Sequence, residues 1–258
     1  MSRNAGIGLD RRLDIEWLDT VAAQVASAED ILSIRSKLFD VLDGKVSGGM
    51  KRGTASHKTV GVLLRTWAKV PEELVSFRDN ALRVLPSLTR VERMALHWAI
   101  LIGGFAFFGD AATNTGRLLA LQGNLTLSQL TRRMRETWGE RSTMNRATQR
   151  VVRSMVQWGG LADTESKGVY TQTSKRIQVR GELTEVLIEA LLIHEGKGIP
   201  VDQALSHPAL FPFRLNLRGH SLRQSSRFEV HRQGLDEDVV NLVLGNPHDN
   251  ASRVRSTR

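Results

Sequence analysis

The chain has 258 residues, a formal net charge of +9 and no cysteine. The lack of cysteine excludes disulfide bonds, a thiolate zinc site and a cysteine nucleophile, and it is consistent with the reducing cytoplasm, where we expect the protein. Hydrophobic residues make up 41% of the chain, which is enough for the buried core of one large domain or of a few small ones.

Helical spacing of apolar residues dominates residues 1–109, which we interpret as an N-terminal helical bundle. Helices are expected at 13–26, 31–42, 55–69, 71–85 and 89–108. The last helix opens with a capping box of Thr89 and Glu92 and is apolar nearly all round, which is typical of the centre of a bundle. Gly103-Gly104 within it predicts a close helix contact or a bend.

The most apolar run of the chain, residues 94–108, is shorter than the ~20 residues that span a bilayer. It contains His97, which we expect to be a hydrogen-bonded core histidine rather than a ligand. The first 17 residues carry charges and no apolar core. We therefore expect neither a secretory signal nor a membrane partner.

A basic, glycine-rich loop separates the second and third expected helices. Its glycines and basic residues are Gly44, Gly48, Gly49, Gly53, Lys45, Lys51, Arg52 and Lys58. The spacing is not that of a phosphate-binding loop, and no apolar strand precedes it. We expect a solvated linker, and contact with a DNA backbone is the alternative.

Residues 110–180 have the order of elements found in a winged helix-turn-helix, a compact DNA-binding domain. The expected elements are helices at 110–122, 126–138 and 142–158, then a hairpin at 161–171 that turns at 166–168. Gly139 breaks the chain between the second and third helices, and Ser142 is expected as the N-cap of the third. Gly159-Gly160 ends that helix.

The third of these helices has one apolar and one basic face. At roughly 100° per residue, its apolar side chains share one arc and its basic ones lie opposite. The apolar arc is Met144, Ala147, Val151, Met155 and Trp158, and the polar arc is Arg146, Gln149, Arg150, Arg153 and Gln157. Arginine and glutamine bind guanine and adenine edges in the major groove. We interpret this as a recognition helix, because an ordinary solvated face usually mixes basic with acidic residues.

Positive charge is concentrated around this motif. Residues 124–180 hold 11 basic and 4 acidic residues, a net charge of +7, whereas residues 1–123 carry +3 and residues 181–258 carry −1. Such asymmetry is typical of a surface that binds phosphate. The residues expected to contact DNA are Arg132, Arg133, Arg141, Thr143, Asn145, Arg146, Gln149, Arg150, Arg153, Lys167 and Lys175.

These contacts divide into two groups. Arg146, Gln149, Arg150 and Arg153 would enter or border the major groove, with Asn145 at the edge of that face. The remaining basic residues would bind phosphates, which position a protein without reading sequence.

Residues 181–258 are expected to form a small α+β part. The expected elements are a helix at 182–194, a helical turn at 201–205, extended chain at 207–213, strands at 215–217 and 227–231, and a short helix at 236–244. Residues from Pro247 on are expected to be disordered, and we find no internal repeat. The predicted fold is thus mainly α, with an N-terminal helical bundle (1–109), a winged helix-turn-helix (110–180) and this C-terminal part (181–258).

No pattern in the sequence supports catalysis or metal binding. The seven histidines are scattered and lack metal-ligand spacing, and no nucleophile or dinucleotide motif is present. Asp236-Glu237-Asp238 is expected to cap the last helix rather than to hold a metal. His220, Glu229 and His231 are expected on a solvated hairpin. We expect no enzyme activity, no catalytic residue, no metal and no cofactor.

Several segments resemble the BrxA family, the small and mostly helical accessory proteins of BREX-type phage-defence systems. The segments are KRGTASHKTV (51–60), MALHWAILIGGFAFF (94–108), LTLSQL (125–130), NRATQRVVRSMVQWGGL (145–161) and LFPF (210–213). The resemblance covers roughly residues 45–213. The N-terminal 40 residues are longer than the family leads us to expect, and residues 214–258 have no counterpart in it.

The resemblance implies a helical bundle that binds double-stranded DNA without catalysis and acts beside methyltransferase and ATPase partners. Together with the basic helix, it predicts a non-enzymatic DNA-binding subunit of a bacterial antiviral defence system. The alternatives are a stand-alone winged-helix transcription regulator, which would need a dimer and a palindromic site, and a protein-interaction scaffold in a defence complex.

Overall fold

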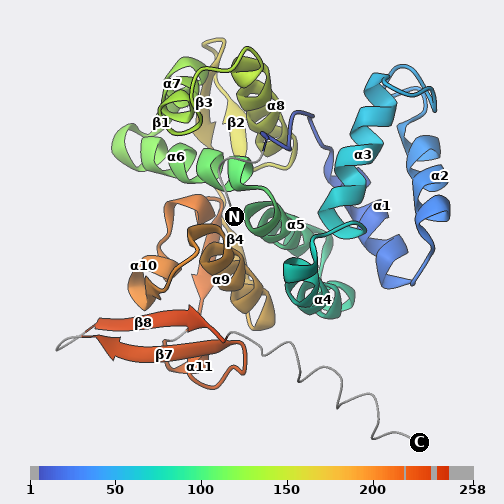
Figure 1. The fold of residues 1–258 in the computed structure, drawn as a ribbon. Coiled ribbons are helices and arrows are strands. Elements are labelled where there is room, and N and C mark those ends of the chain that lie inside the picture. Colours follow the sequence, from blue (N-terminus) through green and yellow to red (C-terminus); the bar gives the residue numbers. More distant parts are fainter. Residues whose placement is uncertain (1–5, 218, 234–236, 244–258) are drawn as a thin grey trace, which may run out of the picture.

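The computed structural model describes residues 6–217, 219–233 and 237–243. This part of the chain is mainly α-helical with small sheets, as the apolar spacing predicted (Figure 1). The N-terminal helices are α1 (Ile15–Ala26), α2 (Ile31–Leu42), α3 (Ala55–Trp67), α4 (Val75–Val84) and α5 (Arg90–Gly104). Short 3-10 turns, η1 (Glu72–Leu74) and η2 (Leu85–Ser87), flank α4.

The apolar helix expected at 89–108 is divided at Phe105. It forms α5 and the start of α6 (Ala106–Gln122), and the two helices are bent by 117°. A Cβ added at Gly103 would lie 2.7 Å from Cε1 of Phe77, so the glycine pair serves both a bend and a close contact. Among the described residues no single helix has the length and apolar character to cross a membrane, although this bent pair together meets both criteria.

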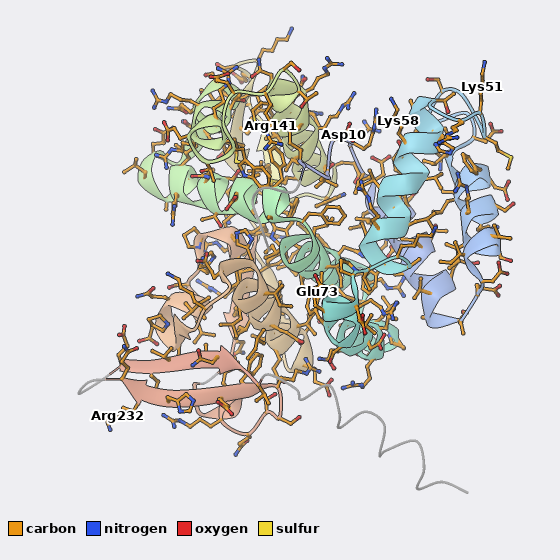
Figure 2. The ribbon with its side chains drawn as sticks, in the orientation of Figure 1. Asp10, Lys51, Lys58, Glu73, Arg141 and Arg232 are labelled. Atoms are coloured by element: carbon orange, nitrogen blue, oxygen red, sulfur yellow. The ribbon has the colours of Figure 1, made fainter. Side chains whose placement is uncertain are left out.

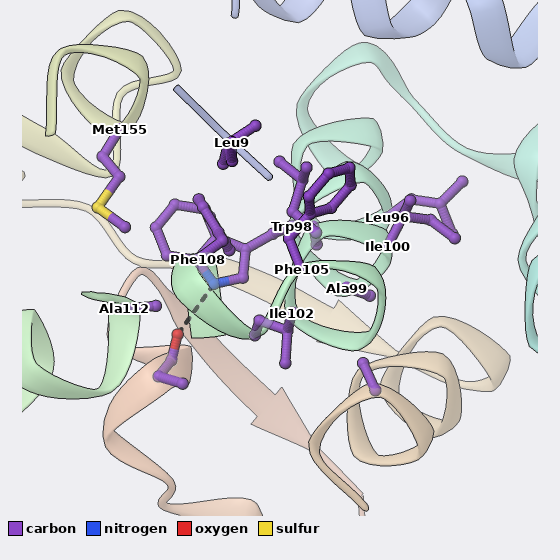
Figure 3. Packing of buried hydrophobic residues seen from close by; sticks show 14 of the residues in the cluster. Leu9, Leu96, Trp98, Ala99, Ile100, Ile102, Phe105, Phe108, Ala112 and Met155 are labelled. Atoms are coloured by element: carbon purple, nitrogen blue, oxygen red, sulfur yellow. Dashed lines mark hydrogen bonds between the residues drawn. The ribbon is translucent and has the colours of Figure 1, made fainter. Parts of the chain in front are cut away.

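Trp98 of α5 lies at the centre of the core (Figure 3). Its ring makes edge-on contacts with four aromatic rings from later parts of the chain, at centroid distances of 5.1 to 5.9 Å. The four rings belong to Phe108, Trp158, Phe211 and Phe213. The indole N–H donates to the carbonyl of Ala209 at 2.9 Å, which satisfies its one polar atom inside the core.

His97 is confirmed as a buried core histidine with two partners. The indole of Trp67 donates to its Nδ1 at 3.2 Å, and its Nε2 lies 2.9 Å from a carboxylate oxygen of Asp19. Since an indole N–H can only donate, Nδ1 must accept and the proton must sit on Nε2. Burial lowers the pKa of His97 below 6.5, and the hydrogen bond to Asp19 opposes this shift.

Residues 106–172, here called the first unit, follow the expected order of three helices and a hairpin, with one added strand. The elements after α6 are β1 (Asn124–Thr126), α7 (Leu127–Trp138), α8 (Met144–Gln157), β2 (Leu161–Asp163) and β3 (Val169–Gln172). The strands form an antiparallel sheet in the order β1-β3-β2. Ser142 is not the N-cap of α8 as expected, because the helix begins one residue later, after Thr143.

The C-terminal residues from Glu182 on repeat the order of elements of the first unit, which the sequence did not indicate. The elements are β4 (Ile177–Arg180), α9 (Glu182–Glu195), β5 (Ile199–Pro200), α10 (Val201–Leu205), η3 (Pro208–Leu210), β6 (Phe213–Asn216), α11 (Gly219–Leu222), β7 (Phe228–Gln233) and β8 (Glu237–Leu242). From α9 on, helix, strand, two helices and hairpin recur, with an antiparallel sheet in the order β5-β8-β7. The insertion that carries η3 and β6 separates α10 from α11, and β6 pairs in parallel with β4.

The prediction of a short helix at 236–244 is wrong. Residues 237–242 form β8, in which Val240 is fully buried between β5 and β7. Pairing on both sides and the β-branched Val239 and Val240 outweigh the helical spacing of this short segment. The acidic residues Glu237 and Asp238 therefore lie on a strand and do not cap a helix, while Asp236 and the tail expected to be disordered from Pro247 lie outside the described residues.

Gly116 fixes how closely α6 can approach η3. A Cβ at this position would lie 1.9 Å from the carbonyl oxygen of Pro208, whereas a Cβ at Gly61 in α3 would meet nothing within 4 Å. We expect Gly116→Ala to lower the free energy of unfolding by about 1–3 kcal/mol through overpacking against backbone. Gly61→Ala, the matched control, should raise it by up to about 1 kcal/mol through helix propensity. Urea denaturation measures both, and a stabilised Gly116→Ala protein would contradict this packing.

The lowered pKa of His97 predicts acid sensitivity. Below pH ~6.5, the unfolded chain takes up a proton at this histidine before the folded chain does, so stability falls as the pH drops. Between pH 7.5 and 5.5 the loss from this group is at most about 1.4 kcal/mol. Urea denaturation at both pH values should show a smaller loss for His97→Gln than for the wild type. Equal losses would contradict the assignment of a neutral buried imidazole.

Candidate nucleic-acid interface

A groove of about 670 Å³ lies between α7, the first half of α8 and the turn that joins β2 to β3. Its lining residues are Thr126, Leu127, Ser128, Thr131, Arg132, Arg135, Asn145, Arg146, Gln149, Lys167, Gly168 and Val169. Four of them are basic and none is acidic. The remaining polar residues offer hydroxyl and amide groups, so the groove suits an anionic ligand that also accepts hydrogen bonds.

Local hydrogen bonds hold the walls of this groove in place. α7 begins with a capping box in which the Thr126 hydroxyl accepts from the backbone N–H of Gln129 at 3.1 Å. The side chain of Gln129 accepts from the N–H of Thr126 at 2.9 Å. The N–H of Leu127 donates to the carbonyl of Gly168 at 3.0 Å, which ties the hairpin turn to the start of α7. The backbone around the groove is thus preformed.

Three of the four basic side chains of the groove are available to a ligand. Arg132, Arg146 and Lys167 are exposed, and in the described part of the chain no ion pair links them to a carboxylate. Arg135 is half-buried; it donates to the side-chain oxygen of Asn145 at 2.8 Å, and its Nε lies 3.6 Å from Glu140. Arg135 was missing from the predicted contacts, although its position three residues after Arg132 places both on one helix face.

The second half of α8 is covered by residues 7–15, here called the N-terminal segment. The N–H of Leu13 donates to the Ser154 hydroxyl at 2.9 Å, and the Trp158 indole donates to the Leu13 carbonyl at 2.8 Å. The N–H of Ile15 donates to the side chain of Gln157 at 3.1 Å. On the other side, Arg65 of α3 donates to the carbonyl of Gly8 at 2.7 Å, so the segment joins α3 to α8 (Figure 2).

Two of the arginines predicted to contact DNA are engaged elsewhere and do not line the groove. Arg150 is half-buried and donates to the backbone carbonyl of Asp10 in the N-terminal segment. Burial lowers the pKa of Arg150, and the nearby Arg11 lowers it further. Arg153 donates to both carboxylate oxygens of Asp163 at 2.6 and 2.8 Å, and this hydrogen bonding raises the pKa of Arg153.

The other predicted contacts lie around the groove rather than in it. Arg133 is half-exposed on α7, and Arg141 is exposed with its guanidinium 6.0 Å from the Trp138 ring. Thr143 is exposed before α8, where its side chain makes no capping hydrogen bond. Lys175 is exposed in the turn between β3 and β4. The groove therefore gathers Arg132, Asn145, Arg146, Gln149 and Lys167 from the predicted set.

Acidic residues and histidines do not gather in the described residues to form a candidate metal site of three or more such side chains. Glu229 and His231 are exposed on β7 with 3.2 Å between Oε2 and Nε2, and the side chain of His220 lies outside the described residues. Comparison of the chain with protein-family models, with curated proteins and with solved structures gives no match. The groove and its charge are thus the main physical grounds for assigning a function.

The different positions of Arg146 and Arg150 predict different effects of removing them. Arg150→Ala should lower the free energy of unfolding by about 1–2 kcal/mol, because a charge-assisted hydrogen bond to the N-terminal segment is lost. Limited trypsin digestion should then cleave faster after Arg11 and Arg12. Arg146→Ala, the control, should change stability by less than about 0.5 kcal/mol, because its side chain is exposed and unpaired. Equal stability and cleavage in both variants would contradict this difference.

Proposed function

We propose that the first unit is a winged helix-turn-helix that binds duplex DNA, and that the chain is a non-enzymatic DNA-binding protein. The groove supports this proposal, because four basic residues from α7, α8 and the hairpin turn line it without one acidic side chain. In this proposal α8 is the recognition helix and the β2–β3 hairpin is the wing. The net charge of +7 over residues 124–180 favours the approach of a polyanion.

Only the first half of α8 is proposed to read bases. Asn145, Arg146 and Gln149 line the groove there, and these residue types make bidentate contacts with adenine and guanine in the major groove. The second half is covered by the N-terminal segment. This division agrees with the way helix-turn-helix proteins bind, in which the N-terminal residues of the recognition helix contact base edges.

The remaining basic residues of the groove are proposed to bind phosphates. Arg132 and Arg135 project from α7, and Lys167 projects from the hairpin turn. Their positions on either side of α8 would fix its orientation in the major groove without contributing sequence preference. Arg133, Arg141 and Lys175 would add weaker phosphate contacts at the periphery, since each of them lies outside the groove.

The biological setting is proposed from the resemblance to the BrxA family. Two of the segments that carry it overlap the proposed DNA-binding elements, since residues 125–130 include the start of α7 and residues 145–161 include most of α8. We propose that the protein acts in a bacterial antiviral defence system of the BREX type. Its partners there would be methyltransferase and ATPase subunits.

Binding to a random duplex across a salt series tests the proposal. Fluorescence anisotropy between about 50 and 200 mM salt should show a steep fall in affinity for the wild type, because bound phosphates release counterions. In the variant Arg132→Glu with Arg146→Glu, here called the groove variant, affinity at low salt should fall at least about tenfold. The slope of log affinity against log salt should become shallower by about 1, because Arg132 is proposed to bind phosphate and Arg146 to read bases.

The matched control changes the net charge by the same amount outside the groove. Lys37→Glu with Lys69→Glu, here called the control variant, reverses two exposed lysines, one on α2 and one just after α3. Its affinity should stay within about threefold of the wild type, because neither lysine lines the groove and separated surface charges are screened by salt. If the groove variant and the control variant bind equally well, or if the wild type does not bind at low salt, the proposal is wrong.

A further inference from the structure

A second basic surface lies outside the groove, on the parallel strand pair β4–β6. Its outward side chains are Arg176, Gln178 and Arg180 from the β4 segment and Arg214 and Asn216 from β6. All five are exposed. We call this set the arginine ladder. It holds three arginines and two amides, and none of its members is acidic.

The register of the two strands explains why these side chains share a face. Gln178 is opposite Arg214, and Arg180 is opposite Asn216. Successive strand residues point to opposite faces, so residues two apart lie together. The alternate residues, among them Val179 and Phe213, are buried in the core. The three arginines are thus diagonal neighbours across the pair: Arg176 and Arg180 lie four residues, about 13 Å, apart along one strand, and Arg214 lies on the neighbouring strand opposite Gln178, between them.

The arginines of the ladder differ from the structural arginines of this chain. Arg153 pairs with Asp163, and Arg227 lies 3.6 to 4.0 Å from three carboxylates of α9. In the described residues, by contrast, no ion pair involves Arg176, Arg180 or Arg214. Within the described residues, no ion pair with a carboxylate neutralises these three guanidinium groups.

The carboxylate of Glu92 interacts electrostatically with Arg180 of the ladder. Its carboxylate is already occupied, because it accepts from the hydroxyl of Thr89 at 2.7 Å and from the N–H of Thr89 at 3.0 Å. These hydrogen bonds lower the pKa of Glu92. The carboxylate is thus held at the start of α5 by its capping role, and no hydrogen bond among the described residues joins it to Arg180.

We propose that the arginine ladder is a second phosphate-binding surface that contacts the backbone of duplex DNA. Guanidinium groups bind phosphate through two parallel hydrogen bonds, and the amides of Gln178 and Asn216 add neutral donors between them. A polyanion with regularly spaced phosphates matches such a row of donors. The inference rests on the proposed function, since it takes duplex DNA as the ligand.

The ladder is suited to phosphate and not to bases or lipid. The ladder is the face of a two-stranded sheet, so its side chains would meet the phosphate backbone of the duplex. Phosphate contacts carry no sequence information. An amphipathic membrane surface would also need apolar side chains beside the cations. The exposed large apolar residues of the described chain, Leu32, Met50, Val91, Leu121 and Val243, are not members of the ladder.

The test compares four proteins on the same random duplex. They are the wild type, the groove variant, the control variant and the ladder variant, Arg176→Glu with Arg214→Glu, which has the same change in net charge. The ladder variant should lose at least about tenfold in affinity at low salt, and its salt slope should become shallower by about 2. Its preference between duplex sequences should equal that of the wild type. Thermal unfolding shows whether each variant is folded. If the Glu variant does not fold, the duplex affinity of Arg176→Gln with Arg214→Gln is measured in its place.

The outcomes separate the two surfaces. A ladder variant that binds like the control variant, beside a groove variant that has lost affinity, would overturn the ladder and leave the groove. The reverse result would support the ladder and overturn the groove. Loss of binding to phosphatidylserine vesicles with unchanged DNA affinity would overturn the ladder as a DNA contact. A wild type that binds no duplex at low salt would overturn both proposals.

Discussion

The packing of one indole holds the parts of this chain together. Trp98 of α5 meets Phe108 of α6, Trp158 after α8, and Phe211 and Phe213 before and in β6, while its N–H bonds the carbonyl of Ala209. The N-terminal helices, the first unit and the C-terminal insertion therefore share a single buried contact. Gly116 allows the same insertion to reach α6, because a side chain there would collide with the backbone of Pro208. The positions of α8 and of β6 follow from this centre, and with them the groove and the arginine ladder.

The N-terminal segment limits what α8 can offer to a ligand. Hydrogen bonds from Leu13 and Ile15 engage Ser154 and Gln157, Arg150 donates to Asp10, and Arg153 pairs with Asp163, so the polar side chains of the second half have partners. The exposed part of that face is the first half, beside α7 and the hairpin turn. The polar arc of α8 looks uniform in sequence, but its second half is bound to other parts of the chain and its first half is accessible. The accessible half lies beside the preformed walls of the groove.

Repeated connectivity with different charge is a second feature of the molecule. The first unit and the C-terminal residues from α9 on share the order of helix, strand, helices and hairpin, and both sheets place the third strand in the middle. Residues 124–180 carry +7, whereas residues 181–258 carry −1. The acidic residues of α9 neutralise Arg227 and accept hydrogen bonds from Asn80 of α4, so this charge serves internal contacts. Burial raises the pKa of Glu189 within that cluster. The shared topology alone therefore does not imply a shared ligand.

The sequence by itself determined the helices, the hairpin and the concentration of positive charge, because apolar spacing, capping residues and glycines act locally. The capping box at Thr89, the core role of His97 and the bend near Gly103 were all predictable from neighbouring residues. Only the tertiary structure decided that Arg150 and Arg153 leave the groove, that Arg135 joins it and that residues 237–242 form a strand. Two of these depend on partners far away in the chain: Asp10 for Arg150, and β5 for β8. Helical periodicity gives the face on which a side chain lies, but long-range packing selects which side chains on that face stay free for a ligand.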